Sequence, residues 1–277
     1  MQKNKADLYK KSVSDIYSSR SKTYDSSENS AWHELICKNL VDLSGIRPGS
    51  RVLDVATGTG MLAFYAASKV VPDGTVIGID ISEYMINKAK SKIPGHGMGN
   101  ICFEVMDGEN IDHSSGSFDF IFCSSALVLM TNIVATLTHW KKFLNVGGKV
   151  CFNAFSENSF INGVVAQSVL RNYGVNYEMN NITGTAKKCR TLLELSGFKN
   201  IEVKTENYGC FISLEDAKKS WISTSYPAPG QFPHPLACLT QEQLSQVRQD
   251  YEREMETLHT KDGIWNDMTT FYAIASD

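Results

Sequence analysis

A short apolar run followed by two glycines constrains this chain more than any other stretch. Residues 52–55 read Val-Leu-Asp-Val, which is typical of a strand buried on both faces of a parallel sheet. Gly58 and Gly60 follow, and residues 61–67 favour a helix. Glycines at such a junction let the backbone turn tightly and let a ligand approach, and the helix behind them offers unpaired N–H groups. The pattern predicts a nucleotide-cofactor site at the carboxyl edge of an α/β sheet.

The glycine spacing is compatible with two classes of cofactor. Gly58, Gly60 and Ala63 also satisfy the dinucleotide fingerprint, which is a weak signal on its own. Asp54 separates the two classes, because a carboxylate inside the strand would repel a pyrophosphate. S-adenosylmethionine carries an ammonium and a sulfonium and has no phosphate, so the same carboxylate would attract it. We therefore expect S-adenosylmethionine and keep a nicotinamide enzyme as the alternative.

Residues 52–60, Val-Leu-Asp-Val-Ala-Thr-Gly-Thr-Gly, resemble motif I of class I S-adenosylmethionine-dependent methyltransferases. The resemblance is strongest to the type that includes the ubiquinone and menaquinone biosynthesis enzymes. It implies an α/β, Rossmann-like fold with a doubly wound, mostly parallel sheet of seven strands and a helical lid inserted before the last strand. It also implies that the turn residues Ala56, Thr57, Gly58 and Gly60, together with Asp54, bind the cofactor.

Asp80 is the second acidic residue at a predicted strand end. It closes the predicted strand at 75–80, where a carboxylate can accept hydrogen bonds from both ribose hydroxyls. An acidic residue there is often only the cap of the next helix, but Ser82 is available for that role. Ile81 and Met85 are expected to flank the adenine, although Met85 could equally belong to the core.

Asp107 and Gly108 follow the predicted strand at 101–106. They resemble the Asp-Ala-Glu element of the family, in which the Asp side chain and the next backbone N–H contact adenine. A carboxylate is a suitable acceptor for the exocyclic amine. A plain turn or capping role for Asp107 is the alternative.

The residues after the predicted strand at 118–123 are expected beside the methyl group. In the resembled family this segment lies next to the methionyl part of the cofactor, so Ser124 and Ser125 are assigned to the cofactor, and Leu127 and Val128 to the methyl acceptor. The chain has no Asn/Asp-Pro-Pro-Tyr sequence at this position. Its absence argues against methylation of DNA adenine or of glutamine.

The polar N-terminal segment, residues 1–30, is expected to be a solvated, partly helical arm. In the resembled family an N-terminal segment with a Tyr-Asp or Phe-Asp pair folds over the cofactor, and Tyr24-Asp25 matches that pair. We therefore assign Tyr24 to the cofactor and Tyr17 to the acceptor. Both tyrosines could instead only anchor the arm to the core.

The C-terminal part predicts an insertion. Residues 31–213 and 264–277 are expected to form the cofactor-binding core, with the strand at 269–275 antiparallel beside the one at 150–155. Residues 214–263 are expected to form a lid or acceptor pocket, because a connection of some fifty residues between neighbouring strands is unusually long and such insertions often cover a binding site. Trp221 and His234 are assigned to acceptor binding, and aromatic residues such as Tyr226 suggest a partly apolar acceptor. No catalytic residue is assigned, because a general base is optional in methyl transfer.

Composition bounds the remaining possibilities. The chain has 277 residues, 42% of them hydrophobic and 21% charged, with a net charge of −3, which gives no general attraction to nucleic acid or anionic membrane. No secretory signal or transmembrane run is visible. Seven cysteines show no zinc spacing, so we expect no metal, buried thiols (Cys102, Cys123 and Cys151 in strands) and a cytoplasmic location.

The sequence thus predicts a monomeric or weakly dimeric enzyme that methylates O, N or C of a small, partly apolar metabolite by in-line displacement. Two alternatives stay open. One is a carboxyl methyltransferase acting on a free or carrier-bound acid. The other is a non-catalytic scaffold that binds S-adenosylmethionine.

Overall fold

The computed structural model describes residues 3–26, 30–221 and 229–277, which form two compact units. Unit 1 comprises Met1–Asn153, Cys189–Lys204 and Tyr272–Asp277, and unit 2 comprises Ala154–Lys188 and Thr205–Phe271. The predicted insertion at 214–263 falls within unit 2, which also takes in segments on either side of it. Tyr226 lies outside the described residues.

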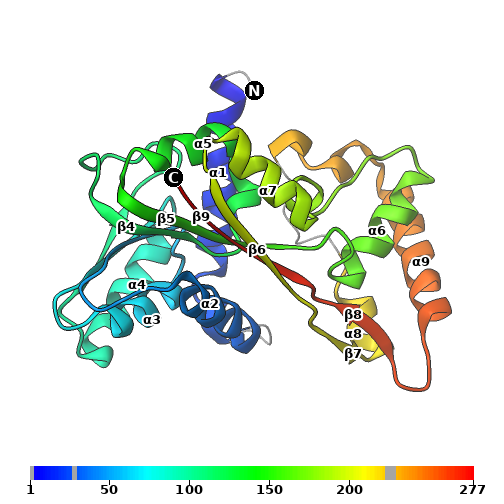
Figure 1. Ribbon diagram of the computed structural model, residues 1–277. Helices are drawn as coiled ribbons and strands as arrows, with labels where there is room; N and C mark the ends of the chain where they lie inside the picture. The colour runs from blue at the N-terminus through cyan, green and yellow to red at the C-terminus, as the bar shows by residue number, and fades with distance from the viewer. Residues whose placement is uncertain (1–2, 27–29, 222–228) are drawn as a thin grey trace. The chain divides into compact units, whose positions relative to one another are not determined.

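The main sheet has seven strands in the order β3-β2-β1-β4-β5-β9-β6, which confirms the predicted fold class (Figure 1). Its strands are β1 (Arg51–Val55), β2 (Thr75–Asp80), β3 (Ile101–Val105), β4 (Phe118–Cys123), β5 (Leu144–Phe155), β6 (Asn200–Glu206) and β9 (Thr270–Ser276). The pairs β1–β2, β1–β4, β2–β3 and β4–β5 are parallel. Thr269, before β9, accepts from Ser156, just after β5, and Ser276, at the end of β9, accepts from Lys199, before β6, so β9 runs antiparallel to both neighbours.

Helices cover both faces of the sheet within unit 1. They are α1 (Lys3–Arg20), α2 (Ser30–Ser44), α3 (Met61–Val70), α4 (Glu83–His96), α5 (Ile133–Lys141) and α7 (Ala186–Leu195). Figure 1 shows α2, α3 and α4 on one face and α5 and α7 on the other. Two short 3-10 helices, η1 (Tyr24–Ser26) and η2 (Leu127–Leu129), lie near the carboxyl ends of the strands. This is the doubly wound arrangement that places ligands at the carboxyl edge.

Two local predictions in unit 1 need correction, and one helix has an unusual end. The N-terminal arm is partly helical as expected, with α1 ending at Arg20, but it is not simply solvated, because Tyr9 is 1% exposed. Helix α4 continues through Pro94 and ends at His96, because a proline in the last turn removes only one backbone hydrogen bond and Gly97 caps the helix with φ +62°. Cys102 is exposed rather than buried, since β3 is the edge strand and successive side chains point to opposite faces.

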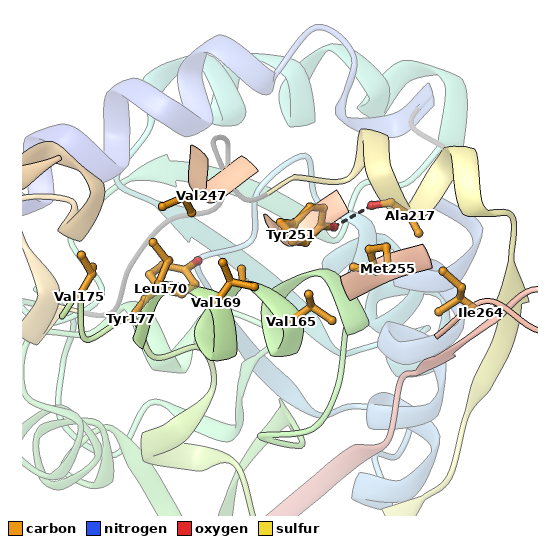
Figure 2. Close-up of a cluster of buried hydrophobic side chains, with 11 residues drawn as sticks. Val165, Val169, Leu170, Val175, Tyr177, Ala217, Val247, Tyr251, Met255 and Ile264 are labelled. Carbon is orange, nitrogen blue, oxygen red and sulfur yellow. Dashed lines mark hydrogen bonds between the residues drawn. The ribbon is translucent and has the colours of Figure 1, made fainter. Parts of the chain in front are cut away.

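Unit 2 is built around an apolar cluster of its own. Its helices are α6 (Ile161–Arg171), η3 (Asn181–Thr183), α8 (Leu214–Lys219), η5 (Pro229–Gln231), η6 (Pro235–Cys238) and α9 (Gln241–Leu258). Figure 2 shows side chains of α6, α8 and α9 meeting in this cluster, where the Tyr251 hydroxyl donates to the Ala217 carbonyl at 2.7 Å. Strands β7 (Gly209–Ile212) and β8 (Ile264–Asp267) form an antiparallel pair that the sequence analysis did not predict. Among the described residues, no helix is long and apolar enough to cross a membrane.

Candidate cofactor site

One cavity lies over the carboxyl ends of β1 to β4, and every residue that lines it belongs to unit 1. It encloses about 820 Å³ of empty space, part of it open to solvent. Its walls come from α1, η1 and the four strand ends: Tyr9, Lys10, Val13, Tyr17, Tyr24, Ala56, Gly58, Asp80, Ile81, Met85, Met106, Asp107, Gly108, Glu109, Ser124, Ser125, Ala126, Leu129 and Met130.

The turn after β1 presents its backbone to this cavity. Ala56 and Gly58 both have a positive φ of 56°, and an added Cβ on Gly58 would meet no protein atom within 4 Å. Gly60 has φ +86°, and a Cβ there would lie 2.7 Å from the Phe103 ring. Gly58 is therefore required for access to the cavity, whereas Gly60 is required for packing of the turn on β3.

Asp54 lies beneath that turn and does not line the cavity. Its side chain is 1% exposed, and one carboxylate oxygen accepts from the Thr57 hydroxyl at 2.6 Å. Burial raises the pKa of Asp54 to about 7, although the bonds from Thr57 and from the Ala63 N–H oppose this shift. A cation placed over the turn would favour the ionised carboxylate.

Asp80 holds two backbone segments together at the cavity wall. Its two oxygens accept from the Gly58 N–H at 2.9 Å and from the Ser82 N–H at 2.8 Å. Ser82 caps α4 by accepting from the Met85 N–H at 3.2 Å, as the sequence predicted. Burial raises the pKa of Asp80 despite these two bonds. The carboxylate therefore has a fixed orientation toward the cavity.

Asp107 carries an ion pair that the sequence analysis missed. Lys10 Nζ lies 2.7 Å from Asp107 Oδ2 and also contacts Glu109 Oε2. Burial alone would raise the pKa of Asp107, but the bonds from Lys10, the Glu109 N–H and Asn110 hold it below its ordinary value. Burial alone would lower the pKa of Lys10, and its two carboxylate partners raise it instead. This triad fixes α1 at the β3 end of the cavity.

Two adjacent faces of α1 make the contact with the rest of unit 1. Tyr9, Val13 and Tyr17 all line the cavity, and the Tyr9 hydroxyl donates to the Leu129 carbonyl at 3.1 Å. The neighbouring face carries Lys10 and two serines, of which Ser14 contacts the Ile81 carbonyl and Ser18 contacts Ser82. A spacing of four residues brings each set onto one side of a helix. This stripe in the sequence could have identified Tyr9, Lys10 and Val13.

The segment after α1 closes onto the glycine turn. Asp25 accepts from the Thr59 hydroxyl at 2.6 Å and pairs with Lys92 at 3.2 Å. Tyr24, the preceding residue, lines the cavity, and burial raises the pKa of its phenol and of the Tyr17 phenol. Both phenols are therefore protonated at neutral pH and can donate hydrogen bonds.

The corner after β4 is fixed by a buried residue of β5. Asn153 is 1% exposed, and within the described part of the chain its side chain forms hydrogen bonds with Ser124 and Ser125. Ser125 has φ +57°, an uncommon conformation for a residue with a Cβ. The sequence analysis did not identify Asn153, because an asparagine within a strand carries no motif.

The structure brings most of the predicted cofactor residues to the cavity wall, together with Tyr17. It does not bring Asp54, Thr57 or Gly60 there, since all three are buried within the turn. Leu127 is 1% exposed and Val128 is half-buried, and neither lines the cavity. Their predicted contact with an acceptor stays a prediction.

Trp221 and His234 line a separate, shallow hollow in unit 2, together with Leu236 and Arg248. The His234 Nδ1 accepts from the Leu236 N–H at 3.2 Å and so caps η6. The role in acceptor binding that was assigned to Trp221 and His234 also stays a prediction.

Comparison with known proteins agrees with this geometry. A family model described as a methyltransferase domain matches residues 46–197. Aklanonic acid methyltransferase DauC of Streptomyces sp. (strain C5) is 34% identical over 146 residues, which are 53% of this chain and 66% of that protein. The ubiquinone/menaquinone biosynthesis C-methyltransferase UbiE of Hydrogenovibrio crunogenus is 32% identical over 126 residues, covering 45% of this chain and 50% of that protein. The matches thus span between half and about two thirds of these relatives.

A solved structure shares the fold. The SAM-dependent methyltransferase from Aquifex aeolicus superposes with a TM-score of 0.54 at 20% identity, over 70% of this chain and 92% of that one.

Proposed function

The chain belongs to the methyltransferase-domain family, and we propose that it transfers a methyl group from S-adenosylmethionine to a small, partly apolar metabolite. The observation that supports this proposal is the cavity over the carboxyl ends of β1 to β4, which is lined by most of the residues predicted to bind the cofactor. The acceptor atom is O, N or C. The enzyme acts as a monomer or weak homodimer.

The residues present fit this cofactor. Open space over Gly58 leaves room for a ligand against the backbone, where any side chain would intrude. Asp80 would accept the ribose hydroxyls, and Asp107 with the Gly108 N–H would contact the adenine. A carboxylate has about four acceptor positions, of which Asp107 uses three, so one remains for an amine. Ala56, Gly58, Ser124 and Ser125 would hold the amino-acid portion.

The chain's own contribution to the reaction is positioning and exclusion of water. The bound cofactor supplies an electrophilic methyl group on a sulfonium. Helix α1 covers the cavity and is held there by the ion pair of Lys10 with Asp107 and by the hydrogen bond from Tyr9 to the Leu129 carbonyl. This cover would keep water from the reacting atoms. Holding an acceptor in line with the methyl group can lower the barrier by roughly 7–11 kcal/mol through orientation alone.

The acceptor is expected to be partly apolar because aliphatic and thioether side chains line the same cavity. These are Val13, Ile81, Met85, Met106, Ala126, Leu129 and Met130. No histidine occurs among the described residues that line it. This favours acceptors that need no general base, so a carboxyl group of an acid is the second candidate.

A panel of phenolic, amine, enol and carboxylic acid metabolites tests the proposal. The protein is incubated with S-adenosylmethionine and each compound, and S-adenosylhomocysteine is quantified by mass spectrometry. We expect acceptor-dependent formation of S-adenosylhomocysteine, and a loss of it in Asp80→Asn. Binding of the cofactor without turnover on any compound would favour a non-catalytic scaffold, and absence of binding would refute the proposal.

A further inference from the structure

Asn153 is a buried amide whose three side-chain hydrogen bonds, within the part of the chain that the structure describes, all reach one corner of the cavity. Its Oδ1 accepts from the Ser124 hydroxyl at 2.9 Å and from the Ser125 N–H at 3.0 Å. Its Nδ2 donates to the Ser125 hydroxyl oxygen at 3.0 Å. Asn153 itself does not line the cavity, whereas Ser124 and Ser125 do.

The orientation of this amide follows from chemistry. The backbone N–H of Ser125 can only donate, so the Asn153 atom facing it must be the carbonyl oxygen. The other end of the amide is then the NH₂ group, which can only donate. The Ser125 hydroxyl oxygen therefore accepts from Asn153, and its own proton must point elsewhere.

Counting protons separates the two serines. The Ser124 hydroxyl donates its hydrogen bond to Asn153, and its oxygen contacts the Cys37 sulfur at 3.4 Å. The Ser125 hydroxyl donates to no group that the structure describes, and its side chain lies at the cavity wall. The positive φ of Ser125 is maintained by the bond from its N–H to Asn153. The corner thus presents one hydroxyl donor to the cavity.

We propose that Asn153 is a positioning residue that turns the Ser125 O–H into the cavity, where it donates to the carboxylate of the cofactor's amino-acid portion. This inference rests on the proposed function. With Asp80 taking the ribose hydroxyls and Asp107 the adenine, the amino-acid portion falls to the ends of β1 and β4. The carboxylate is the strongest acceptor that this portion carries, and a hydroxyl donor matches it.

Three variants test this assignment: Ser125→Ala, Asn153→Asp and Asn153→Leu. Ser125→Ala removes the donor. Asn153→Asp keeps the shape but replaces the NH₂ with an acceptor, so the Ser125 proton turns back toward β5. Asn153→Leu removes both the acceptor and the donor of the amide, and it replaces Asn153→Asp if that variant does not fold. Thermal melting shows whether each variant is folded. Dissociation constants for S-adenosylhomocysteine and 5′-methylthioadenosine, which lacks the amino-acid portion, are measured by calorimetry.

We expect each variant to raise the dissociation constant of S-adenosylhomocysteine about tenfold or more and to leave that of 5′-methylthioadenosine within about twofold. The double variant Ser125→Ala/Asn153→Asp should bind about as weakly as Ser125→Ala alone, because both changes remove one interaction. Asn153→Asp also adds a carboxylate close to the ligand's own carboxylate, so the uncharged Asn153→Leu distinguishes loss of the donor from charge repulsion.

Asn100→Asp is the matched control. Asn100 also donates from a side-chain amide to two oxygens of unit 1, the Ala67 and Gly74 carbonyls, but it does not line the cavity. This control should bind both ligands normally.

Normal S-adenosylhomocysteine affinity in Ser125→Ala or in a folded Asn153 variant would overturn the inference while leaving the proposed function intact. Equal losses for both ligands, or additive losses in the double variant, would also overturn it. A natural protein that binds neither ligand would refute the proposed function, and the inference with it.

Discussion

The two units bury different kinds of side chain. At the site of unit 1, buried polar groups such as Asp54, Asp80 and Asn153 bond to the backbone or hydroxyls of strand-end turns. The central cluster of unit 2 is apolar and joins three helices, and its Tyr251 hydroxyl bonds a helix carbonyl. Burying a carboxylate costs free energy of folding unless it is hydrogen-bonded or paired with a cation, whereas burying an apolar side chain stabilises the fold directly. From this contrast we expect cofactor binding in unit 1 and mainly a stabilising role for the cluster of unit 2.

Truncating the cluster of unit 2 should give the largest effect on stability. Tyr251→Ala removes a fully buried ring and is expected to lower the free energy of unfolding of unit 2 by about 3–5 kcal/mol. Hydrogen exchange of amides in α6, α8 and α9 measures this. Tyr251→Phe is the control and should lose about 1 kcal/mol. A tenfold weaker affinity for S-adenosylhomocysteine in Tyr251→Ala, under conditions where unit 1 stays folded, would contradict the division.

The two glycines of the β1 turn should separate stability from binding within unit 1. Gly60→Ala introduces a Cβ against Phe103 at φ +86° and should lower the free energy of unfolding by about 2–4 kcal/mol. Gly58→Ala meets no protein atom and should lose about 1–2 kcal/mol from its backbone conformation. The added methyl group of Gly58→Ala should nevertheless weaken cofactor affinity. Denaturant unfolding measures the stability of both variants, and calorimetric titration measures their affinity for the cofactor. Equal effects of the two changes on binding would be inconsistent with the assigned roles.

Asp54 predicts a pH dependence of the ligand-free protein. Its folded pKa of about 7 lies above its unfolded value, so its neutral form stabilises the fold at low pH. That contribution should be lost as the pH rises from about 4 to 7, and Asp54→Asn should flatten the profile in this window. Affinity for S-adenosylmethionine should rise over the same window, because the cation favours the carboxylate. An unchanged pH profile of affinity in Asp54→Asn would remove the electrostatic argument for the cofactor.

The smallest effect is expected from the ion pair of α1. Lys10→Met should weaken the attachment of α1 by about 1–2 kcal/mol, since the pair is partly exposed and solvent screens it. Faster hydrogen exchange in α1 measures the loss, and Lys11→Met, an exposed neighbour, is the control. Because the pKa of Asp107 is lowered, the attachment should persist at acid pH until that carboxyl protonates. Unaltered exchange would show that the tyrosine contacts alone hold the helix.

Strands β1, β2 and β4 were predictable because each is a mostly apolar, largely buried run. β2 and β4 begin and end at the predicted residues, and Asp80 and Asp107 lie at the same edge as expected. Residues 145–148, which include two glycines, lie within β5, where the pairing with β4 shifts register between Phe118 and Phe120, so these residues bulge out of the ladder. A glycine-rich bulge and a tight turn have the same sequence signature.

The parts of the site that were missed depend on contacts between distant segments. Lys10 lies in a lysine-rich stretch that is typical of a solvated helix, and only the fold places Asp107 and Glu109 beside it. Asn153 looks like any polar residue in a strand until Ser125 is brought next to it. Conversely, Asp54 was correctly recognised as buried, but it supports the turn from below instead of lining the cavity.

Calorimetric titration of the unaltered protein with S-adenosylmethionine and, separately, with NADH tests the central claim most directly. The account predicts saturable binding of S-adenosylmethionine at a single site, competition by S-adenosylhomocysteine, and no heat of binding with NADH. Binding of NADH, or no binding of S-adenosylmethionine up to about 1 mM, would contradict it.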